Sequence, residues 1–206
     1  MGVLAATASE ASSPRRQESN VTTEYDLQKV KVAIVDDSPF MIDLIRYMLE
    51  HLGCRHIRPA NDTASLMHEL DDCADQDPTN IPDIIISDWA MKPSTGLDLI
   101  TWLRQHRQPA LHYTPFIMLS AYSTRDHVIA ARNAGANEFL TKPLSTQTLV
   151  QRLSRIIENP QPFVRAPAYF GPDRRRRAVP YDLARERRQP RSFPIRDMDE
   201  DLKSHP

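Results

Sequence analysis

The chain has 206 residues, of which 40% are hydrophobic and 26% are charged, as in a soluble globular protein with some disordered sequence. No apolar run approaches the roughly 18 residues that a membrane span needs, which argues against membrane insertion. The net charge of -1 argues against nucleic acid binding by the chain as a whole. Two cysteines do not make a disulfide framework, and no basic region precedes the apolar residues at the N-terminus. These features favour a cytoplasmic protein.

Composition divides the chain into three parts. Residues 1–27 are rich in Ala, Ser, Thr and Glu without apolar periodicity, which predicts a disordered leader. Residues 28–158 carry regular apolar patterns and an excess of acidic side chains, so we expect them to form one folded domain. Residues 159–206 are rich in proline and arginine and lack a sustained hydrophobic period, which predicts a disordered tail.

Within the predicted domain, short apolar strands alternate with segments of helical periodicity. The first strand ends at Asp36, and Ser38 and Pro39 then supply an N-cap and a proline for the first helical turn. The expected strands cover residues 30–35, 54–58, 83–87, 115–119 and 138–141, and the expected helices cover 39–52, 63–70, 97–107, 126–134 and 145–158. This alternation predicts an α/β fold with a doubly wound parallel sheet.

Chemically active side chains follow the carboxyl ends of four predicted strands. Asp36 and Asp37 follow the first, Asp88 the third, Ser120 the fourth and Lys142 the fifth. In an open α/β sheet this edge is where ligands bind. Two carboxylates ~4 Å apart repel by about 4 kcal/mol at an effective dielectric of 20. A hard cation such as Mg²⁺ removes that repulsion and prefers oxygen ligands, so the cluster predicts a magnesium site.

Five short segments resemble the receiver domain of two-component response regulators, the CheY-like superfamily. They are Ile34-Val35-Asp36-Asp37-Ser38, Ile86-Ser87-Asp88-Trp89-Ala90-Met91, Leu119-Ser120-Ala121, Ala134-Gly135-Ala136 and Leu140-Thr141-Lys142-Pro143. The resemblance covers about residues 28–158. It implies a flavodoxin-like (βα)5 fold with strand order 2-1-3-4-5, in which the first and third strands are neighbours.

The resemblance implies that Asp88 is the phosphorylated residue. It further implies that Asp37, Asp88 and the main-chain carbonyl of Ala90 ligate Mg²⁺ directly, and that Asp36 acts through water.

The resemblance also assigns residues on the fourth and fifth strands. Ser120 and Lys142 are expected to contact phosphoryl oxygens. Phe139 matches the aromatic position whose rotamer reports the switch, although plain core packing is the competing interpretation. One departure concerns the acceptor loop, because the family usually places proline four residues after the acceptor. Here Lys92 stands there and Pro93 follows.

These observations predict a stand-alone receiver that takes its phosphoryl group from a histidine kinase or a histidine phosphotransfer protein. It would not be an enzyme beyond removing its own phosphoryl group. Its output is expected to be altered binding of a downstream partner through the face formed by residues 126–134, 138–141 and 145–158. One alternative is a Mg²⁺-dependent phosphatase of the haloacid dehalogenase type, but Asp36-Asp37-Ser38-Pro39 lacks its Asp-x-Asp signature.

The tail leaves three interpretations open. It could be a solvated linker, a partner-binding segment, or a scaffold or nucleic-acid-binding element, including one that binds anionic membrane. Aromatic and arginine side chains supply most anchors in interfaces. The candidate partner contacts are therefore Tyr169, Phe170, Arg174, Arg175, Arg176 and Arg177.

Overall fold

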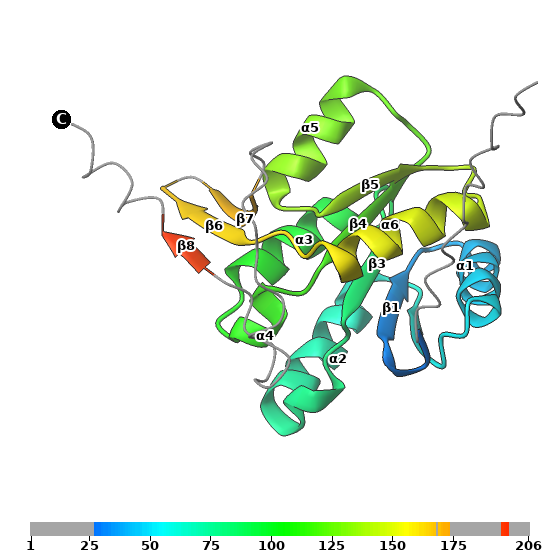
Figure 1. Ribbon diagram of the computed structural model, residues 1–206, viewed down its shortest axis with the longest axis horizontal. Coiled ribbons are helices and arrows are strands. Elements are labelled where there is room, and N and C mark those ends of the chain that lie inside the picture. Colours follow the sequence, from blue (N-terminus) through cyan, green and yellow to red (C-terminus); the bar gives the residue numbers. More distant parts are fainter. Residues whose placement is uncertain (1–26, 168, 174–194, 198–206) are drawn as a thin grey trace, which may run out of the picture.

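A computed structural model describes residues 27–167, 169–173 and 195–197, and its main body is a five-stranded parallel sheet with the order β2-β1-β3-β4-β5 (Figure 1). The strands are β1 (Lys31–Val35), β2 (His56–Ala60), β3 (Ile84–Asp88), β4 (Phe116–Ser120) and β5 (Glu138–Thr141). The doubly wound fold and its strand order are thereby confirmed. Among the described residues, no helix combines the length and apolarity needed to cross a membrane.

Helices cover both faces of the sheet. The longer ones are α1 (Pro39–His51), α2 (Thr63–Gln76), α3 (Gly96–Gln105), α5 (Arg125–Ala134) and α6 (Thr146–Glu158), and the short elements are η1 (Leu27–Lys29), η2 (Pro78–Asn80) and α4 (Pro109–His112). Ile34 and Ile86 pack with buried residues of α1 and α6. Ala33 and Ile85 point to the other face, where they pack with α2, α3 and α5. The alternation follows from the two-residue period of a strand.

Most predicted boundaries differ from the observed ones by a residue or two, and the largest differences involve β2 and α2. The strand begins at His56 rather than at residue 54, because the amide of Cys54 donates to the carbonyl of Leu49 (3.0 Å) in the turn that ends α1. Asp62 caps α2 through the amide of Ser65, and the helix runs six residues past its predicted end. The one-turn helix α4 was not predicted.

The structure differs most from the sequence prediction at residues 163–172, which were expected to lie in a disordered tail. Strands β6 (Phe163–Ala166) and β7 (Tyr169–Pro172) pair antiparallel, and β8 (Ile195–Asp197) pairs parallel with β6. Phe163 and Val164 are buried, at 0% and 3% exposure. These strands are too short to show a hydrophobic period. The rings of Phe163 and Phe170 contact each other (5.5 Å between centroids), and both contact Tyr113 of the preceding domain.

The remaining predictions for the two ends fall outside the described residues. They concern the leader up to residue 26 and residues 174–194 and 198–206, which include the Arg174–Arg177 run.

Candidate functional site

Three carboxylates meet where β1 and β3 end. Asp36 and Asp37 follow β1, and Asp88 is the last residue of β3, which lies beside β1 with Val35 opposite Ser87. One oxygen from each carboxylate lies within 4.8 Å of the others. Asp36 and Asp88 are buried, and Asp37 is exposed. The structure thus brings together the acidic residues that the sequence singled out, in an arrangement whose oxygen donors suit a hard divalent cation.

Lys142 reaches this cluster from the end of β5. Its Nζ lies 2.7 Å from Asp36 Oδ2 and 2.7 Å from Asp88 Oδ1. Burial alone would lower the pKa of Lys142, but its hydrogen bonds to and charge attraction by Asp36 and Asp88 raise the pKa above its usual value. The ammonium is therefore charged at neutral pH and offsets part of the acidic charge.

Main-chain amides hold the two buried carboxylates in place. Asp36 Oδ1 accepts from the amide of Ser38 (2.9 Å), and Asp88 Oδ2 accepts from the amide of Ala90 (3.0 Å). Burial raises the pKa of the Asp36 carboxyl, against the lowering effects of Lys142 and Ser38. Each oxygen of Asp36 is thus committed to a donor, whereas Asp37 faces solvent.

Ser120 ends β4, between the strands that carry Asp88 and Lys142. It is 1% exposed, and its Oγ accepts a hydrogen bond from the amide of Tyr122 (3.0 Å). The carbonyl of Ser120 accepts from the amide of Lys142 (2.8 Å). The hydroxyl and the ammonium therefore belong to adjoining strand ends at the edge where Asp88 lies.

The loop of residues 89–95, called the acceptor loop for the role that the resemblance implies for Asp88, carries the departure noted in the sequence. Lys92 and Pro93 are both exposed, and the peptide bond between them is cis.

Aromatic rings line the loops beside Asp88, and the sequence prediction identified only one of them, Phe139. The Trp89 ring makes an edge contact with Phe139 (6.5 Å between centroids) and another with His127 (4.9 Å). The ring of Tyr122 stacks on His127 at 5.7 Å. Phe139 is partly buried and packs against the core. Trp89 directly follows Asp88 and Tyr122 lies two positions after Ser120, which was the available signal, whereas His127 is not near either residue in the sequence.

The tail residues that the structure describes lie elsewhere. Tyr169 and Phe170 belong to β7, and the Phe170 ring contacts His112 at the end of α4. Neither residue is part of the carboxylate cluster.

Comparison with known proteins places this site in a family. A model described as the response regulator receiver domain matches residues 32–154. The chemotaxis protein CheY of Pseudomonas aeruginosa is 30% identical over 129 residues, covering 63% of this chain and 97% of that protein. The chemotaxis protein CheY-3 of Vibrio cholerae is 30% identical over 133 residues, covering 64% of this chain and 94% of that protein.

Solved structures are similar over the same part. The chemotaxis protein CheY4 of Vibrio cholerae has a TM-score of 0.54 at 26% identity, covering 62% of this chain and 98% of that one. The receiver domain of a signal transduction histidine kinase from Syntrophus aciditrophicus has a TM-score of 0.54 at 27% identity, covering 64% and 92%. The parallel sheet, the acidic cluster typical of a receiver Mg²⁺ site and these matches agree, and the chain belongs to the response regulator receiver domain family of two-component signalling.

Proposed function

We propose that Asp88 accepts a phosphoryl group from a histidine kinase or a histidine phosphotransfer protein. The observation that supports this most is the position of the Asp88 carboxylate at the end of β3. There it lies 2.7 Å from the Lys142 ammonium and within 4.8 Å of oxygens of Asp36 and Asp37. A nucleophilic carboxylate beside a cation and further oxygen ligands suits phosphoryl transfer. The family match favours this role over a haloacid dehalogenase-type phosphatase.

The transfer would exchange one bond to phosphorus for another. A bond forms between an Asp88 carboxylate oxygen and phosphorus while the bond from phosphorus to the donor histidine nitrogen breaks, and the departing histidine takes up a proton from solvent. Asp37, Asp88 and the carbonyl of Ala90 would hold Mg²⁺, with Asp36 acting through water. When bound, Mg²⁺ neutralises charge on the transferring phosphoryl group.

Lys142 and Ser120 would stabilise the phosphorylated state. Lys142 exchanges a carboxylate partner for a phosphoryl oxygen. Ser120 donates its hydroxyl hydrogen to another phosphoryl oxygen. Because Ser120 ends β4 and Lys142 follows β5, their movement toward the phosphoryl group would change the α5-β5-α6 face. The rotamer of Phe139 would report this change. We place the downstream partner on the same face. Because the chain is similar to chemotaxis proteins, a protein that takes part in chemotaxis is the first candidate for this partner.

Labelling with a small phosphodonor such as acetyl phosphate tests the acceptor. In the presence of Mg²⁺, intact-mass spectrometry should show one added phosphoryl group, and Asp88→Asn should abolish it. Asp126→Asn, which changes an exposed carboxylate in the first turn of α5, is the matched control and should label normally. Unchanged labelling of Asp88→Asn would rule out this residue as the acceptor.

A further inference from the structure

A buried arginine in the last turn of α3 holds the residues at the ends of α4 and α5 in place. Arg104 is 5% exposed, and its guanidinium donates to the carbonyls of Gly135 (3.0 and 3.1 Å), His112 (2.9 Å) and Thr114 (2.8 Å). Burial lowers its pKa to about 9, so it stays charged at neutral pH. Among the described residues, no carboxylate lies within ion-pair distance of it. The charge is stabilised instead by carbonyls at the ends of α4 and α5.

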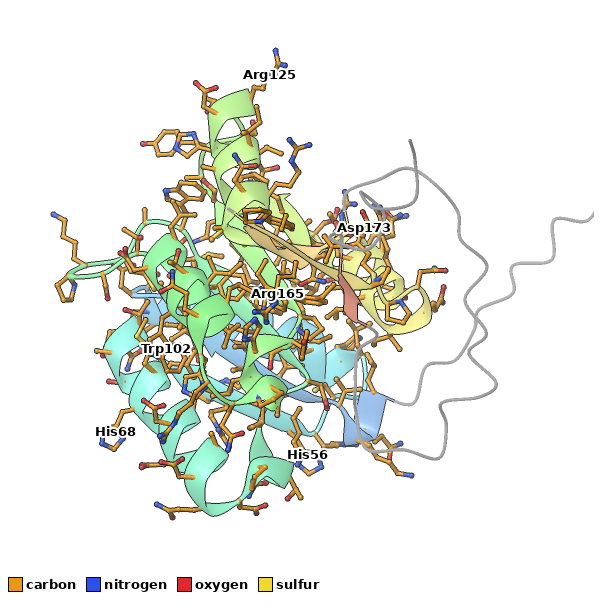
Figure 2. The ribbon with its side chains drawn as sticks, turned by 90° about the vertical axis from the view of Figure 1, so that its left-hand side faces the viewer. His56, His68, Trp102, Arg125, Arg165 and Asp173 are labelled. Carbon is orange, nitrogen blue, oxygen red and sulfur yellow. The ribbon has the colours of Figure 1, made fainter. Side chains whose placement is uncertain are left out.

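The β6–β7 hairpin covers this arginine. The Arg104 guanidinium carbon lies 4.9 Å from the centre of the Phe163 ring, within the range of a cation–π contact. The Phe170 ring contacts the ring of His112 (3.8 Å between centroids). The guanidinium carbon of Arg165 lies 5.2 Å from the centre of the Phe170 ring. The hairpin therefore belongs to the packing of the receiver, and Figure 2 views the molecule from this side, with Arg165 near the centre.

The hairpin backbone also rests directly on the C-terminal end of α5. A Cβ added to Gly171 would lie 2.9 Å from the Cα of Gly135, and one added to Gly135 would lie 3.0 Å from the carbonyl oxygen of Phe170. Gly135 ends α5 with a φ of 99°, a conformation that favours glycine. Because backbone meets backbone here, the contact has little room to absorb a movement of α5.

The other end of α5 faces the acceptor site. His127 in its first turn contacts the rings of Trp89 and Tyr122, and the amide of Tyr122 donates to Ser120 Oγ. The ten residues of α5 span about 15 Å, so a single rigid element joins the two regions. In Figure 2, Arg125 marks the outer end of this helix, away from Arg165 on the hairpin.

We propose that docking of the β6–β7 hairpin on α5 is coupled to the state of Asp88, so that phosphorylation loosens the hairpin. The inference rests on the proposed phosphoacceptor function. A phosphoryl group draws the hydroxyl of Ser120 and the ammonium of Lys142 toward itself. The loop of residues 121–124 and the start of α5 follow, and the tight Gly135–Gly171 contact no longer fits. Linkage requires the reverse effect, so a loosened hairpin favours the phosphorylated arrangement.

Hydrogen exchange on the full chain tests the coupling. The probe is beryllofluoride with Mg²⁺, a phosphoryl analogue whose binding is followed by the fluorine resonance. Amides of residues 163–172 should exchange at least about fivefold faster with the analogue bound, the low end of usual coupling strengths. Bound analogue with unchanged exchange in the hairpin would overturn the coupling and leave the acceptor role intact. Failure of the analogue to bind would overturn both.

Gly171→Ala tests the reverse direction. Its added methyl group would lie 2.9 Å from the Cα of Gly135 and 2.5 Å from the Tyr169 hydroxyl oxygen, so both the α5 contact and the Tyr169 side chain must shift. We expect this variant to bind beryllofluoride about fivefold more tightly than the unmodified protein. Gly53→Ala is the control for a destabilised backbone: a Cβ there meets nothing within 4 Å, but the φ of 87° disfavours alanine, so this variant should lose stability without a change in beryllofluoride affinity. Preserved exchange protection in β3 establishes that the variant is folded. A folded Gly171→Ala protein with a fast-exchanging hairpin and unchanged affinity would contradict the proposal.

Discussion

At the scale of single residues, Lys142 is the cation shared by two carboxylates of the site. Its ammonium contacts two buried carboxylates, whose side chains are 1% exposed in Asp36 and 7% exposed in Asp88. A buried charge that loses its partner keeps its full desolvation cost. In the absence of metal, Lys142 therefore stabilises the folded state by neutralising part of the charge of the carboxylate cluster.

Lys142→Ala should lower the free energy of unfolding by about 2 kcal/mol without metal, because Asp36 and Asp88 lose their cation. This loss of stability should become smaller as Mg²⁺ is added, because a bound cation stabilises the folded state by mass action. In the variant, Mg²⁺ does not compete with an ammonium group for the carboxylates. Urea unfolding at several Mg²⁺ concentrations measures both effects. Lys92→Ala, which removes an exposed lysine from the acceptor loop, should behave like the unmodified protein. A deficit that is independent of Mg²⁺ would contradict this account.

At the scale of secondary-structure elements, the start of α3 packs closely against Asp88. Thr95 and Asp98 form a capping box, and the amide of Gly96 donates to the carbonyl of Trp89 (3.1 Å). A Cβ on Gly96 would lie 2.2 Å from the carbonyl oxygen of Asp88. The helix can therefore begin this close to β3 only with glycine at its first position.

Gly96→Ala should displace the acceptor loop and lower the free energy of unfolding by about 2 kcal/mol, the usual cost of overpacking a buried site. Mg²⁺ affinity should fall as well, because Asp88 and Ala90 move with the loop. Urea unfolding and a metal titration followed by tryptophan fluorescence provide the measurements. Gly53→Ala adds the same methyl group in open space but at a φ of 87°, so it should also lower the free energy of unfolding while leaving the metal titration unchanged. Wild-type affinity in Gly96→Ala would show that the loop tolerates the methyl group.

At the scale of the whole molecule, the folded unit extends past the end of α6 at Glu158. Phe163 has no exposed surface, and it covers the guanidinium of Arg104. Removing the hairpin would expose that charge and the apolar surface around it to water. The domain is therefore expected to need residues 163–172 for its full stability.

Truncation after Glu158 should lower the free energy of unfolding by about 3 kcal/mol relative to truncation after Asp173, since fully burying one phenylalanine stabilises by about 1.5–3 kcal/mol. Both truncated proteins should still be labelled at Asp88, because the carboxylate cluster lies at the opposite ends of the strands. Thermal unfolding and intact-mass spectrometry test the two statements. Equal stability of the two proteins would place the hairpin outside the cooperative unit.

The sequence by itself determined the sheet and the residues of the candidate site. The strand predicted at 83–87 contains three consecutive isoleucines and is followed directly by Asp88, and Ser38-Pro39 is a local helix-start signal. Because the carboxyl ends of parallel strands share one edge, the order of Asp36, Asp88, Ser120 and Lys142 predicted their convergence without coordinates. These signals are local or follow from topology, so a sequence pattern can carry them.

Only the tertiary structure decided the place of the hairpin and the packing around α5. Strands of four residues, such as β6, are too short to show a hydrophobic period. The sequence of α3 gives no sign that the guanidinium of Arg104 is buried. The contacts of Phe163 with Arg104 and of Trp89 with His127 join segments far apart in the chain. Such contacts depend on burial, which is a property of the assembled fold rather than of any single segment.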